Sequence, residues 1–443
     1  MGWQEMVATV RAYETHPPFY YSLLKLWQMV FGASNMSLRA SSLLAGVALL
    51  PLGYACARQA RINPLIVAGL FALNRPLLIA ARQARSYALF ILIYAAAIWV
   101  LLRIKRGSAN WQHWALYLVL LEAMLWLHAL GIFFGAALGL ALLIGLERRY
   151  WRVFIIVHTI AAVMWLPCLY MIVVQDQHRL HGWLTFSASD IWPRLTEGLI
   201  GLNNGVLGAL AIGLAVLGVA SLGARDERKT ALTLLILCVT PVLLEITISA
   251  LKTPIYLPRY FSPAVVPFLM LTAAAPNHPK WGWIGGFALG LCALFSLIIS
   301  VHEINRPPEE RWDAIGAYLN SHVRKGEEVW TIPTDLKMFL SMAAPPTYPI
   351  IGQPVPFPAS LDYPGTRPAG TMAVPGINTS HVTDMIAQAR ARHRTGLWVI
   401  SSRIDLFDPS DALHKQLSAA GRRDLVNSDY DPILLEHWVL NKP

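Results

Sequence analysis

Residues 13–21 read Tyr-Glu-Thr-His-Pro-Pro-Phe-Tyr-Tyr, which places a carboxylate at Glu14 and an imidazole at His16 just ahead of a largely apolar chain. Ionisable groups at the edge of a bilayer are costly to desolvate, so they usually mark function. Pro17 and Pro18 fix the backbone and stop a helix from running through. We therefore expect a rigid corner that presents Glu14 and His16 at the membrane face. The alternative is an interfacial anchor, with the aromatic rings at headgroup depth.

Three later segments also carry polar side chains at the ends of apolar runs. Their polar residues are Gln83, Arg85 and Tyr87, then His128, then Arg259 and Tyr260. Arg85 is either functional or a residue whose charged end reaches to the interface, and its neighbours Gln83 and Tyr87 favour function. Arg259 is equally explained as an anchoring arginine at the start of a span. His128 is at least as well explained as a capped structural histidine in a turn.

The composition is that of a polytopic membrane protein. Of the 443 residues, 55% are hydrophobic and 14% are charged, and the mean hydropathy is +0.47. A soluble domain is about 25% charged. The net charge of +10 comes largely from Lys and Arg in short loops between apolar runs, so it indicates topology and not a nucleic-acid surface. The four cysteines lie in apolar runs and follow no disulfide or metal-binding pattern.

The apolar segments predict the elements that must position these polar residues. A helix needs roughly 17–25 residues to cross a bilayer. On that basis we place ten spans, at 38–57, 64–80, 86–103, 113–129, 131–147, 153–174, 205–223, 231–251, 260–275 and 281–301. Ahead of them, residues 2–13 and 17–31 predict two short helices on the membrane surface, the second closed at Gly32. Glu122 and Glu245 fall inside spans, where they either shape the bundle or face a cavity.

The basic residues in the loops indicate which end of the bundle is cytoplasmic. One end collects Arg58, Arg61, Arg103, Lys105, Arg106, Arg148, Arg149, Arg152, Arg225, Arg228, Lys229 and Lys280. The positive-inside rule makes that end cytoplasmic, so the polar segments described above face outward with everything after residue 301. Ten spans then leave both chain ends outside. Either the short N-terminal helix crosses the membrane with help, or a spanning helix upstream of Met1 is missing from this sequence, and we expect the second.

From about residue 302 the pattern changes to alternating helices and strands, which predicts a small α/β domain. We expect helices at 311–323 and 411–420, the second ended by Gly421, and strands at 328–332, 397–401 and 434–440. The Pro-rich run 345–376 predicts a long irregular loop. The predicted fold class is mainly α, a polytopic membrane helical bundle with a C-terminal extracytoplasmic α/β domain. Its domains are interfacial helices at 1–37, the transmembrane helical domain at 38–301 and the α/β domain at 302–443.

In this order, the polar segments resemble the hallmarks of the PMT/ArnT-like membrane glycosyltransferases of the GT-C class. The matching segments are His16-Pro17-Pro18-Phe19-Tyr20-Tyr21 as HPPxYY, Gln83-Ala84-Arg85-Ser86-Tyr87, the turn at His128 and Arg259-Tyr260. HPPxYY and QARxY in this order are fairly specific together, and each alone is weak. The resemblance covers roughly residues 3–301, and the C-terminal domain fits the family architecture without a specific motif.

The resemblance implies transfer of a sugar from a polyprenyl-phosphate donor in the bilayer to an envelope glycan, lipid or protein. The reaction takes place at the outer face of the bacterial cytoplasmic membrane. Breaking the sugar–phosphate bond leaves charge on the phosphate, which cations at membrane depth must stabilise. By position, His16, Arg85 and Arg259 are the implied phosphate partners, and a guanidinium binds two phosphate oxygens at once. The implied sugar-lining or isoprenoid-lining residues are Tyr20, Tyr21, Gln83, Tyr87, His128 and Tyr260.

The chain departs from the family pattern at its carboxylates. The family's catalytic acid lies in an Asp-Glu pair ahead of HPPxYY, which this chain lacks, and Gln83 stands where the family has Glu. Glu14 is then the implied catalytic carboxylate, which orients or deprotonates the acceptor hydroxyl. We hypothesise that the native protein carries the pair on a helix upstream of Met1, and that without it the chain binds donor lipid but transfers sugar poorly. A stop codon upstream of Met1, with no apolar stretch before it, would refute this.

Two other functions stay open at this level. A transporter or lipid flippase would need broken helices and midplane charges in two matching halves, whereas the charges here cluster at one face. A catalytically silent lipid-sugar-binding subunit is consistent with the missing Asp-Glu pair. We expect no certain cofactor, with a divalent cation as the one alternative, because no known metal-ligand spacing occurs. The expected partners are the donor lipid, the bilayer and the envelope acceptor, and not nucleic acid.

Overall fold

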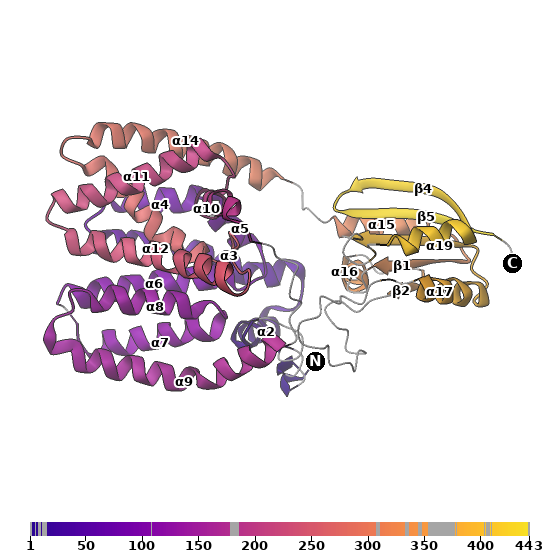
Figure 1. The fold of residues 1–443 in the computed structure, drawn as a ribbon, viewed down its shortest axis with the longest axis horizontal. Helices are drawn as coiled ribbons and strands as arrows, with labels where there is room; N and C mark the ends of the chain where they lie inside the picture. Colours follow the sequence, from indigo (N-terminus) through magenta and orange to yellow (C-terminus); the bar gives the residue numbers. More distant parts are fainter. Residues whose placement is uncertain are drawn as a thin grey trace. The chain divides into compact units, whose positions relative to one another are not determined.

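The computed structural model describes most of the chain, and Figure 1 shows its ribbon. The described residues are 2–4, 6–7, 10, 16–107, 109–177, 186–306, 311–332, 336–343, 348–352, 377, 379–402, 404, 408 and 410–441. They form two compact units, a helical unit up to Asn305 and a sheet unit from Arg306 onward. The domain boundary predicted between residues 301 and 302 therefore falls inside the last helix of the helical unit.

Six of the described helices are long and apolar enough to cross a membrane. They are α3 (Asn35–Gln59), α6 (Tyr87–Lys105), α9 (Trp151–Gln177), α11 (Gly205–Ala224), α12 (Arg228–Leu251) and α14 (Gly282–Asn305). A seventh crossing is formed if α4 (Pro64–Leu73) and α5 (Arg75–Arg82) count as one span, which is bent by 60°. The chain is a multi-pass membrane protein.

The helical unit also contains shorter helices, which account for the difference from the ten predicted spans. They are α2 (Phe19–Phe31), α7 (Trp111–Leu127), α8 (Gly131–Leu143), α10 (Ile191–Ile200), α13 (Val265–Ala274) and the 3-10 turns η1 (Arg148–Tyr150), η2 (Ala188–Asp190), η3 (Ser262–Ala264) and η4 (Ala275–Asn277). Every predicted span overlaps a helix. Helices α8 and α13 are shorter than predicted, whereas α7 has the predicted 17 residues and begins two residues earlier. All residues of α13 are buried, so its apolar character reflects protein packing on every side and not contact with lipid.

The predicted surface helix at 17–31 is α2, and it ends where predicted. Gly32 has a φ of 80°, a left-handed value that glycine adopts without strain, and its N–H donates to the Gln28 carbonyl. Of the other surface helix, predicted at 2–13, the structure describes residues 2–4, 6, 7 and 10. Residues 3, 4, 6, 7 and 10 are helical, and the remainder of that prediction lies outside the described residues.

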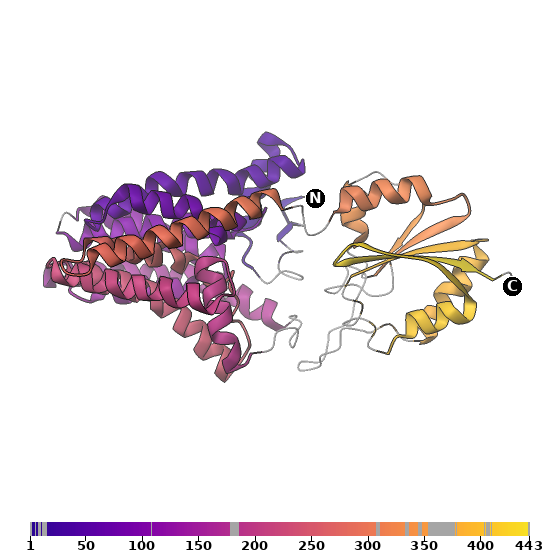
Figure 2. The ribbon, with the colours of Figure 1, turned by 90° about the horizontal axis from the view of Figure 1, so that it is seen from above.

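Close helix packing holds the interior of the helical unit together. The buried helix α6 packs against α3, α7 and α8, and the hydroxyl of Tyr94 donates to the Leu237 carbonyl of α12 at 2.7 Å. A Cβ on Gly218 of α11 would lie only 1.8 Å from the Leu271 carbonyl oxygen of α13. Figure 2 shows the same long helices running side by side. The bundle therefore depends on small residues where two helix backbones approach closely.

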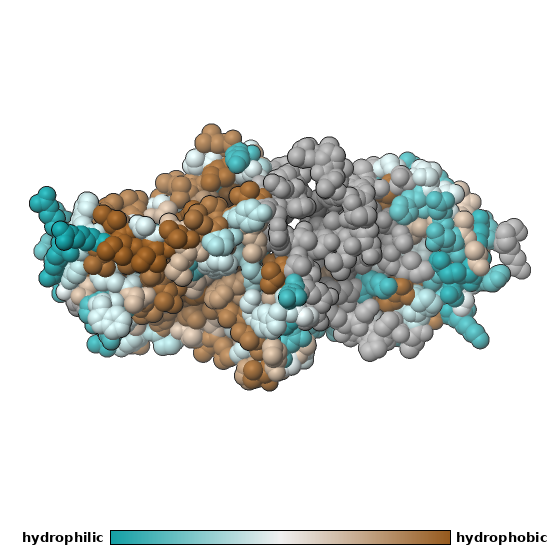
Figure 3. Space-filling view, turned by 90° about the horizontal axis from the view of Figure 1, so that it is seen from below, coloured by the Kyte–Doolittle hydropathy of each residue, from teal (hydrophilic) through white to brown (hydrophobic). Residues whose placement is uncertain are grey.

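Paired charges lie at the end of the helical unit that the positive-inside rule predicts to be cytoplasmic. At the end where α6 finishes, Glu227 pairs with Arg61 at 2.6 Å and with Arg106 at 3.6 Å, and the Lys105 ammonium donates to the Thr233 hydroxyl at 2.7 Å. Figure 3 shows brown apolar residues over the flank of this unit and teal polar residues at its tip. Exposed apolar side chains are numerous on α9 and α14, as expected for surfaces that face lipid.

The sheet unit is a three-layer α/β sandwich (Figure 2). Its sheet has the order β2-β1-β3-β5-β4, parallel between β2, β1 and β3 and antiparallel between β3, β5 and β4. One face packs against α15 and α16 and the other against α17 and α19. The bounds are α15 (Trp312–His322), β1 (Glu327–Ile332), α16 (Leu336–Ala343), β2 (Ile350–Gly352), α17 (Thr379–Ala391), β3 (Gly396–Ser402), α19 (Ala412–Ala420), β4 (Gly421–Tyr430) and β5 (Ile433–Leu440).

The predicted helices and strands of this unit correspond to α15, β1, β3, α19 and β5. The sequence analysis missed α16, β2, α17 and β4. Strand β4 begins at Gly421, which was expected only to end a helix, and it lies at the sheet edge with mostly exposed charged residues. It therefore lacks the alternation of apolar and polar residues that marks a half-buried strand. Strand β2 lies within the Pro-rich run predicted as irregular, and residues 353–376 of that run lie outside the described residues.

Candidate functional site

His128 is the centre of an aromatic group at the end of the helical unit where α6 begins. It terminates α7, and its Nδ1 accepts a hydrogen bond from the Leu130 N–H at 3.1 Å, which places the proton of the neutral ring on Nε2. The ring stacks on Phe90 with a centroid separation of 5.2 Å and is 1% exposed. His128 thus caps the turn into α8, as expected for a structural histidine. It also contacts residues of the predicted site.

His16 lies directly against His128, with the ring centroids 4.4 Å apart. The two prolines that follow it are buried, and Pro18 is the N-cap residue of α2. The Ser22 hydroxyl donates to the Pro18 carbonyl at 2.9 Å, which fixes the first turn of α2. The proline pair therefore positions His16 at the surface of the bundle while α2 continues away from it.

Arg85 lies near two of the predicted tyrosines, Tyr20 and Tyr87. Its charge is close enough to the hydroxyls of Tyr20 and Tyr87 to act on both, and its own side chain is exposed. The Ser42 hydroxyl of α3 donates to the Arg85 carbonyl at 3.4 Å. Burial raises the pKa of the Tyr20 phenol to about 12, against smaller opposing effects of the Ser42 hydroxyl and the Arg85 charge. Tyr20 is therefore a neutral hydroxyl beside an exposed guanidinium.

Arg259 reaches the same group from the turn that precedes η3. Its guanidinium carbon lies 5.3 Å from the centroid of the Tyr260 ring, and it interacts with the Tyr87 hydroxyl. The turn is fixed by the Tyr260 N–H, which donates to the Leu257 carbonyl at 2.9 Å, and by the Ser262 hydroxyl, which donates to the Arg259 carbonyl at 2.9 Å. The Arg259 side chain is exposed.

Aromatic rings from three other segments contact the ring of His128, which therefore links these segments to one another. Its ring centroid lies 5.7 Å from that of Tyr87 and 5.8 Å from that of Tyr260. The structure thus brings together seven predicted residues from four separate segments, namely His16, Tyr20, Arg85, Tyr87, His128, Arg259 and Tyr260. We call these residues the cation–aromatic group. Their roles in binding or catalysis stay predictions.

The other predicted site residues stand differently. Tyr21 contacts the group through the ring of Tyr20, at a centroid distance of 5.6 Å. Gln83 is exposed at the end of α5. Its backbone carbonyl accepts a hydrogen bond from the Arg85 N–H at 2.8 Å. Glu14, the predicted catalytic carboxylate, lies outside the described residues.

Several residues that support the group were not predicted from the sequence. Phe90 stacks on His128, and Ser42 holds the Arg85 backbone. Glu303 pairs with Arg75 at 3.0 Å and Arg82 at 3.6 Å, at the two ends of α5 just ahead of Arg85. These contacts join residues far apart in sequence and follow no local motif. The one available signal was Glu303 itself, a carboxylate near the end of an otherwise apolar helix.

Glu245 and Glu122 have different surroundings. Glu245 of α12 is fully buried, and neither of its carboxylate oxygens has a hydrogen-bond partner among the described residues. Glu122 of α7 is 9% exposed and lies near Trp126 and Cys168. No group of three or more His, Cys, Asp or Glu side chains in the described part of the chain could hold a metal ion.

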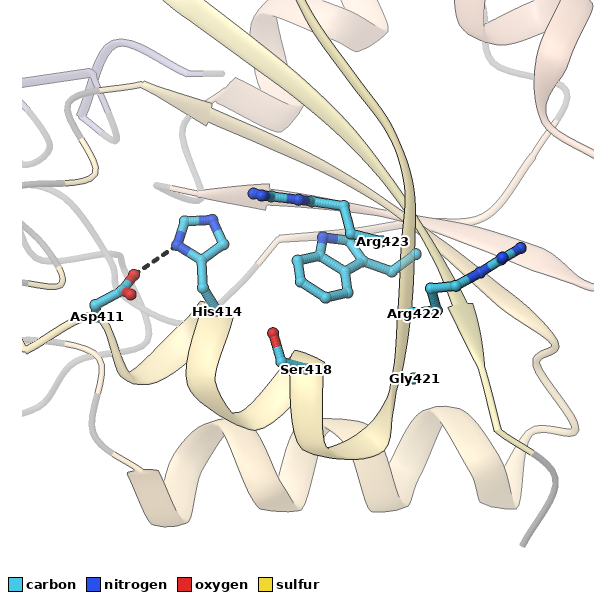
Figure 4. Close-up of a pocket in the computed structure, with 7 residues that line it drawn as sticks. Asp411, His414, Ser418, Gly421, Arg422 and Arg423 are labelled. Carbon is cyan, nitrogen blue, oxygen red and sulfur yellow. Dashed lines mark hydrogen bonds and ion pairs between the residues drawn. The ribbon is translucent and has the colours of Figure 1, made fainter.

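An open pocket of about 530 Å³ lies in the sheet unit, and none of the predicted site residues lines it. Figure 4 shows Asp411 directed at His414, while the side chains of Arg422 and Arg423 point to opposite sides. His414 bridges Asp411 at 2.6 Å and the buried Glu436 at 2.9 Å, and Arg423 also pairs with Glu436 at 2.9 Å. These charges satisfy one another, so the cluster is a structural ion network.

The structure is similar to solved membrane glycosyltransferases. No protein-family model matches the chain, and no curated protein matches it in sequence. ArnT from Cupriavidus metallidurans in the apo state is similar with a TM-score of 0.57 and 13% identity, over 98% of this chain and 91% of that one. The same protein bound to undecaprenyl phosphate gives a TM-score of 0.51 and 14% identity, over 96% and 88%.

A third similar structure is the Archaeoglobus fulgidus oligosaccharyltransferase in the apo form. Its TM-score is 0.51 at 11% identity, over 92% of this chain and 65% of that one. The chain is thus a multi-pass membrane protein with a GT-C-like fold, which confirms the predicted fold class and the predicted resemblance. At these identities the similarity establishes the fold.

Proposed function

We propose that this protein is an integral membrane glycosyltransferase that moves a sugar from a polyprenyl-phosphate donor to a cell-envelope acceptor. The observation that supports it is the meeting of His16, Arg85 and Arg259 in the cation–aromatic group. Three segments remote in sequence supply these side chains at one end of a membrane bundle. ArnT from Cupriavidus metallidurans, which has a similar fold, is bound to undecaprenyl phosphate in one of its structures, and this supports a polyprenyl-phosphate donor.

The proposed donor site uses two exposed guanidinium groups and an imidazole. Arg85 and Arg259 both act on the Tyr87 hydroxyl, so an anion near that hydroxyl would be within reach of both. Each guanidinium can bind two phosphate oxygens, and charge on the departing phosphate is stabilised by such preorganised donors. Nε2–H of His128 is a further donor beside His16. The isoprenoid chain would stay in the bilayer against the apolar helix surfaces.

In the proposed reaction the acceptor hydroxyl oxygen forms a bond to the anomeric carbon of the donor. The bond between that carbon and the phosphate oxygen breaks, and its electron pair stays on the polyprenyl phosphate. The hydroxyl proton passes to a carboxylate, for which Glu14 is the candidate. The reacting face would be the outer face of the cytoplasmic membrane, with the sheet unit outside the cell's cytoplasm, because the basic end of the bundle is the opposite one.

Transfer of radiolabel from a polyprenyl-phosphate sugar in detergent tests the proposal. Arg85→Ala and His16→Ala should each reduce transfer by about 10- to 100-fold, the effect of losing one charged hydrogen bond. Arg58→Ala is the matched control, because Arg58 is an exposed arginine at the basic end. Equal activity in wild type and both site variants would remove the assignment. Donor binding without transfer in the wild type would favour the silent lipid-sugar-binding subunit instead.

A further inference from the structure

The break between α4 and α5 is held in place from two directions. Asn74 at the break is 5% exposed, its side-chain oxygen accepts the Leu77 N–H at 3.2 Å, and its amide donates to the Leu199 carbonyl at 2.9 Å. The break frees the Leu73 carbonyl, which accepts a hydrogen bond from the Ser300 hydroxyl of α14 at 2.7 Å. Hydrogen bonds to α10 and α14 therefore satisfy backbone and side-chain groups at this 60° bend inside an apolar region.

One carboxylate of α14 holds both ends of the short helix that follows the break. Glu303 Oε2 pairs with the Nε of Arg75, the first residue of α5, at 3.0 Å. Glu303 Oε1 lies 3.6 Å from Arg82, the last residue of α5, which also donates to the Glu303 carbonyl. The Glu303 side chain is 12% exposed, so water screens these pairs weakly. Arg75 donates in addition to the Gly201 carbonyl after α10.

The position of α5 determines where Arg85 can lie. Arg82 is three residues ahead of Arg85, and α6 begins two residues after it at Tyr87. The backbone of Arg85 is held on one side by its own N–H, which donates to the Gln83 carbonyl, and on the other by the Ser42 hydroxyl. The short connection between α5 and α6 leaves little freedom, so a shift of α5 would move Arg85 relative to Arg259.

The geometry points to Glu303 as a positioning residue of the donor site. By fixing α5 through Arg75 and Arg82, it holds the Arg85 guanidinium where it can meet the lipid phosphate together with Arg259. This inference rests on the proposed function and adds to it a residue from outside the cation–aromatic group. A small displacement of a binding group lowers donor affinity or rate without unfolding the protein.

Glu227 provides a matched control, because it is also a largely buried carboxylate that pairs with two arginines, and it lies at the opposite end of the bundle. It is 13% exposed and pairs with two arginines, Arg61 at 2.6 Å and Arg106 at 3.6 Å. Glu227→Gln and Glu303→Gln therefore remove equivalent charges from equivalent surroundings. Only the second lies beside the segment that carries Arg85.

The test measures the affinity of purified full-length protein for sugar-free polyprenyl phosphate, and the donor KM and kcat of transfer. Glu303→Gln should weaken phosphate-lipid binding and raise the donor KM about tenfold, a change of about 1.4 kcal/mol, with a smaller change in kcat. Glu227→Gln should leave both near wild type. In an Arg85→Ala background, Glu303→Gln should cause no further loss of affinity, because it acts through Arg85.

The outcomes separate the positioning role from the proposed function. Equal effects of Glu303→Gln and Glu227→Gln, or full additivity with Arg85→Ala, would overturn the positioning role even where the wild type transfers sugar. A wild type that binds polyprenyl phosphate, does not transfer sugar and loses affinity through Glu303→Gln would support the positioning role and overturn transfer. A wild type that neither binds nor transfers would overturn both.

Discussion

Arg85 and Arg259 come from segments separated by most of the helical unit, yet both charges act on the Tyr87 hydroxyl. Two exposed guanidinium groups beside buried aromatic rings supply the charge that the proposed phosphate site requires. A guanidinium presents a planar fork of donors, whereas an ammonium presents a point charge. The identity of these residues as arginine, and not only their charge, should therefore affect phosphate binding.

Replacement of Arg259 tests this directly. Arg259→Ala should weaken binding of polyprenyl phosphate about tenfold or more, because a hydrogen bond to a charged group contributes about 1.5–3 kcal/mol. Arg259→Lys should recover only part of that loss, since it keeps the charge but not the fork. Titration calorimetry of the detergent-solubilised protein measures both. If alanine and lysine variants bind as tightly as wild type, Arg259 does not contact the phosphate.

The residues of the site show what a sequence can and cannot predict. The cation–aromatic group was expected because its members lie in short recognisable segments at the ends of apolar runs. Glu303 was not expected, because its ion pair with Arg75 spans 228 positions and depends on how α14 packs. Glu245 was predicted inside a span, where it would either shape the bundle or face a cavity. The structure shows that it is buried and that its carboxylate oxygens have no hydrogen-bond partner among the described residues.

At the scale of elements, backbone contacts between helices decide where small residues are needed. Long apolar runs predict helices well because the bilayer leaves few other ways to satisfy backbone hydrogen bonds. They do not predict the break at Asn74, which depends on partners in α10 and α14, nor the burial of α13. Edge strand β4 was missed for the opposite reason, since its exposed residues resemble those of a loop.

The contact between α11 and α13 gives a stability prediction. Gly218→Ala should lower the free energy of unfolding by about 1–3 kcal/mol, because its Cβ would overlap the Leu271 carbonyl and force the helices apart. Gly213→Ala in the same helix is the control, since nothing lies within 4 Å of its added Cβ. Thermal unfolding in detergent should show a lower midpoint for the first variant only. Matching midpoints would mean that the helices separate freely at this point.

At the scale of the whole molecule, the two units are stabilised by different interactions. The helical unit depends on apolar packing within a bilayer, with charge pairs at its two ends. The sheet unit instead buries ion pairs beneath its helices, as at Glu436. Hydrogen bonding to Glu436 raises the pKa of His414 to about 9, with burial acting against it and Asp411 adding to it. Burial alone would raise the pKa of Glu436, but His414 and Arg423 lower it below its ordinary value.

These shifts predict how the sheet unit responds to pH. The His414 contribution is complete below its unfolded pKa of about 6.5 and is lost as the pH rises through about 9, where the ring deprotonates. The Glu436 contribution is complete above its ordinary pKa and is lost as the pH falls through its lowered value. Amide exchange of α19 and β5, corrected for intrinsic rates, should be faster at pH 9 than at pH 6.5. His414→Gln should abolish that difference, and a persistent difference would assign it to another group.

Helix α13 has a consequence for how the protein is made. It is too short to cross a membrane by itself and is enclosed on every side, chiefly by α4, α11 and α12. All three precede it in the chain, so the ribosome delivers α13 after the walls of its slot have been synthesised. Helix α14 follows α13 in the chain. The buried position of α13 can therefore be filled before α14, the last helix of the helical unit, has been synthesised.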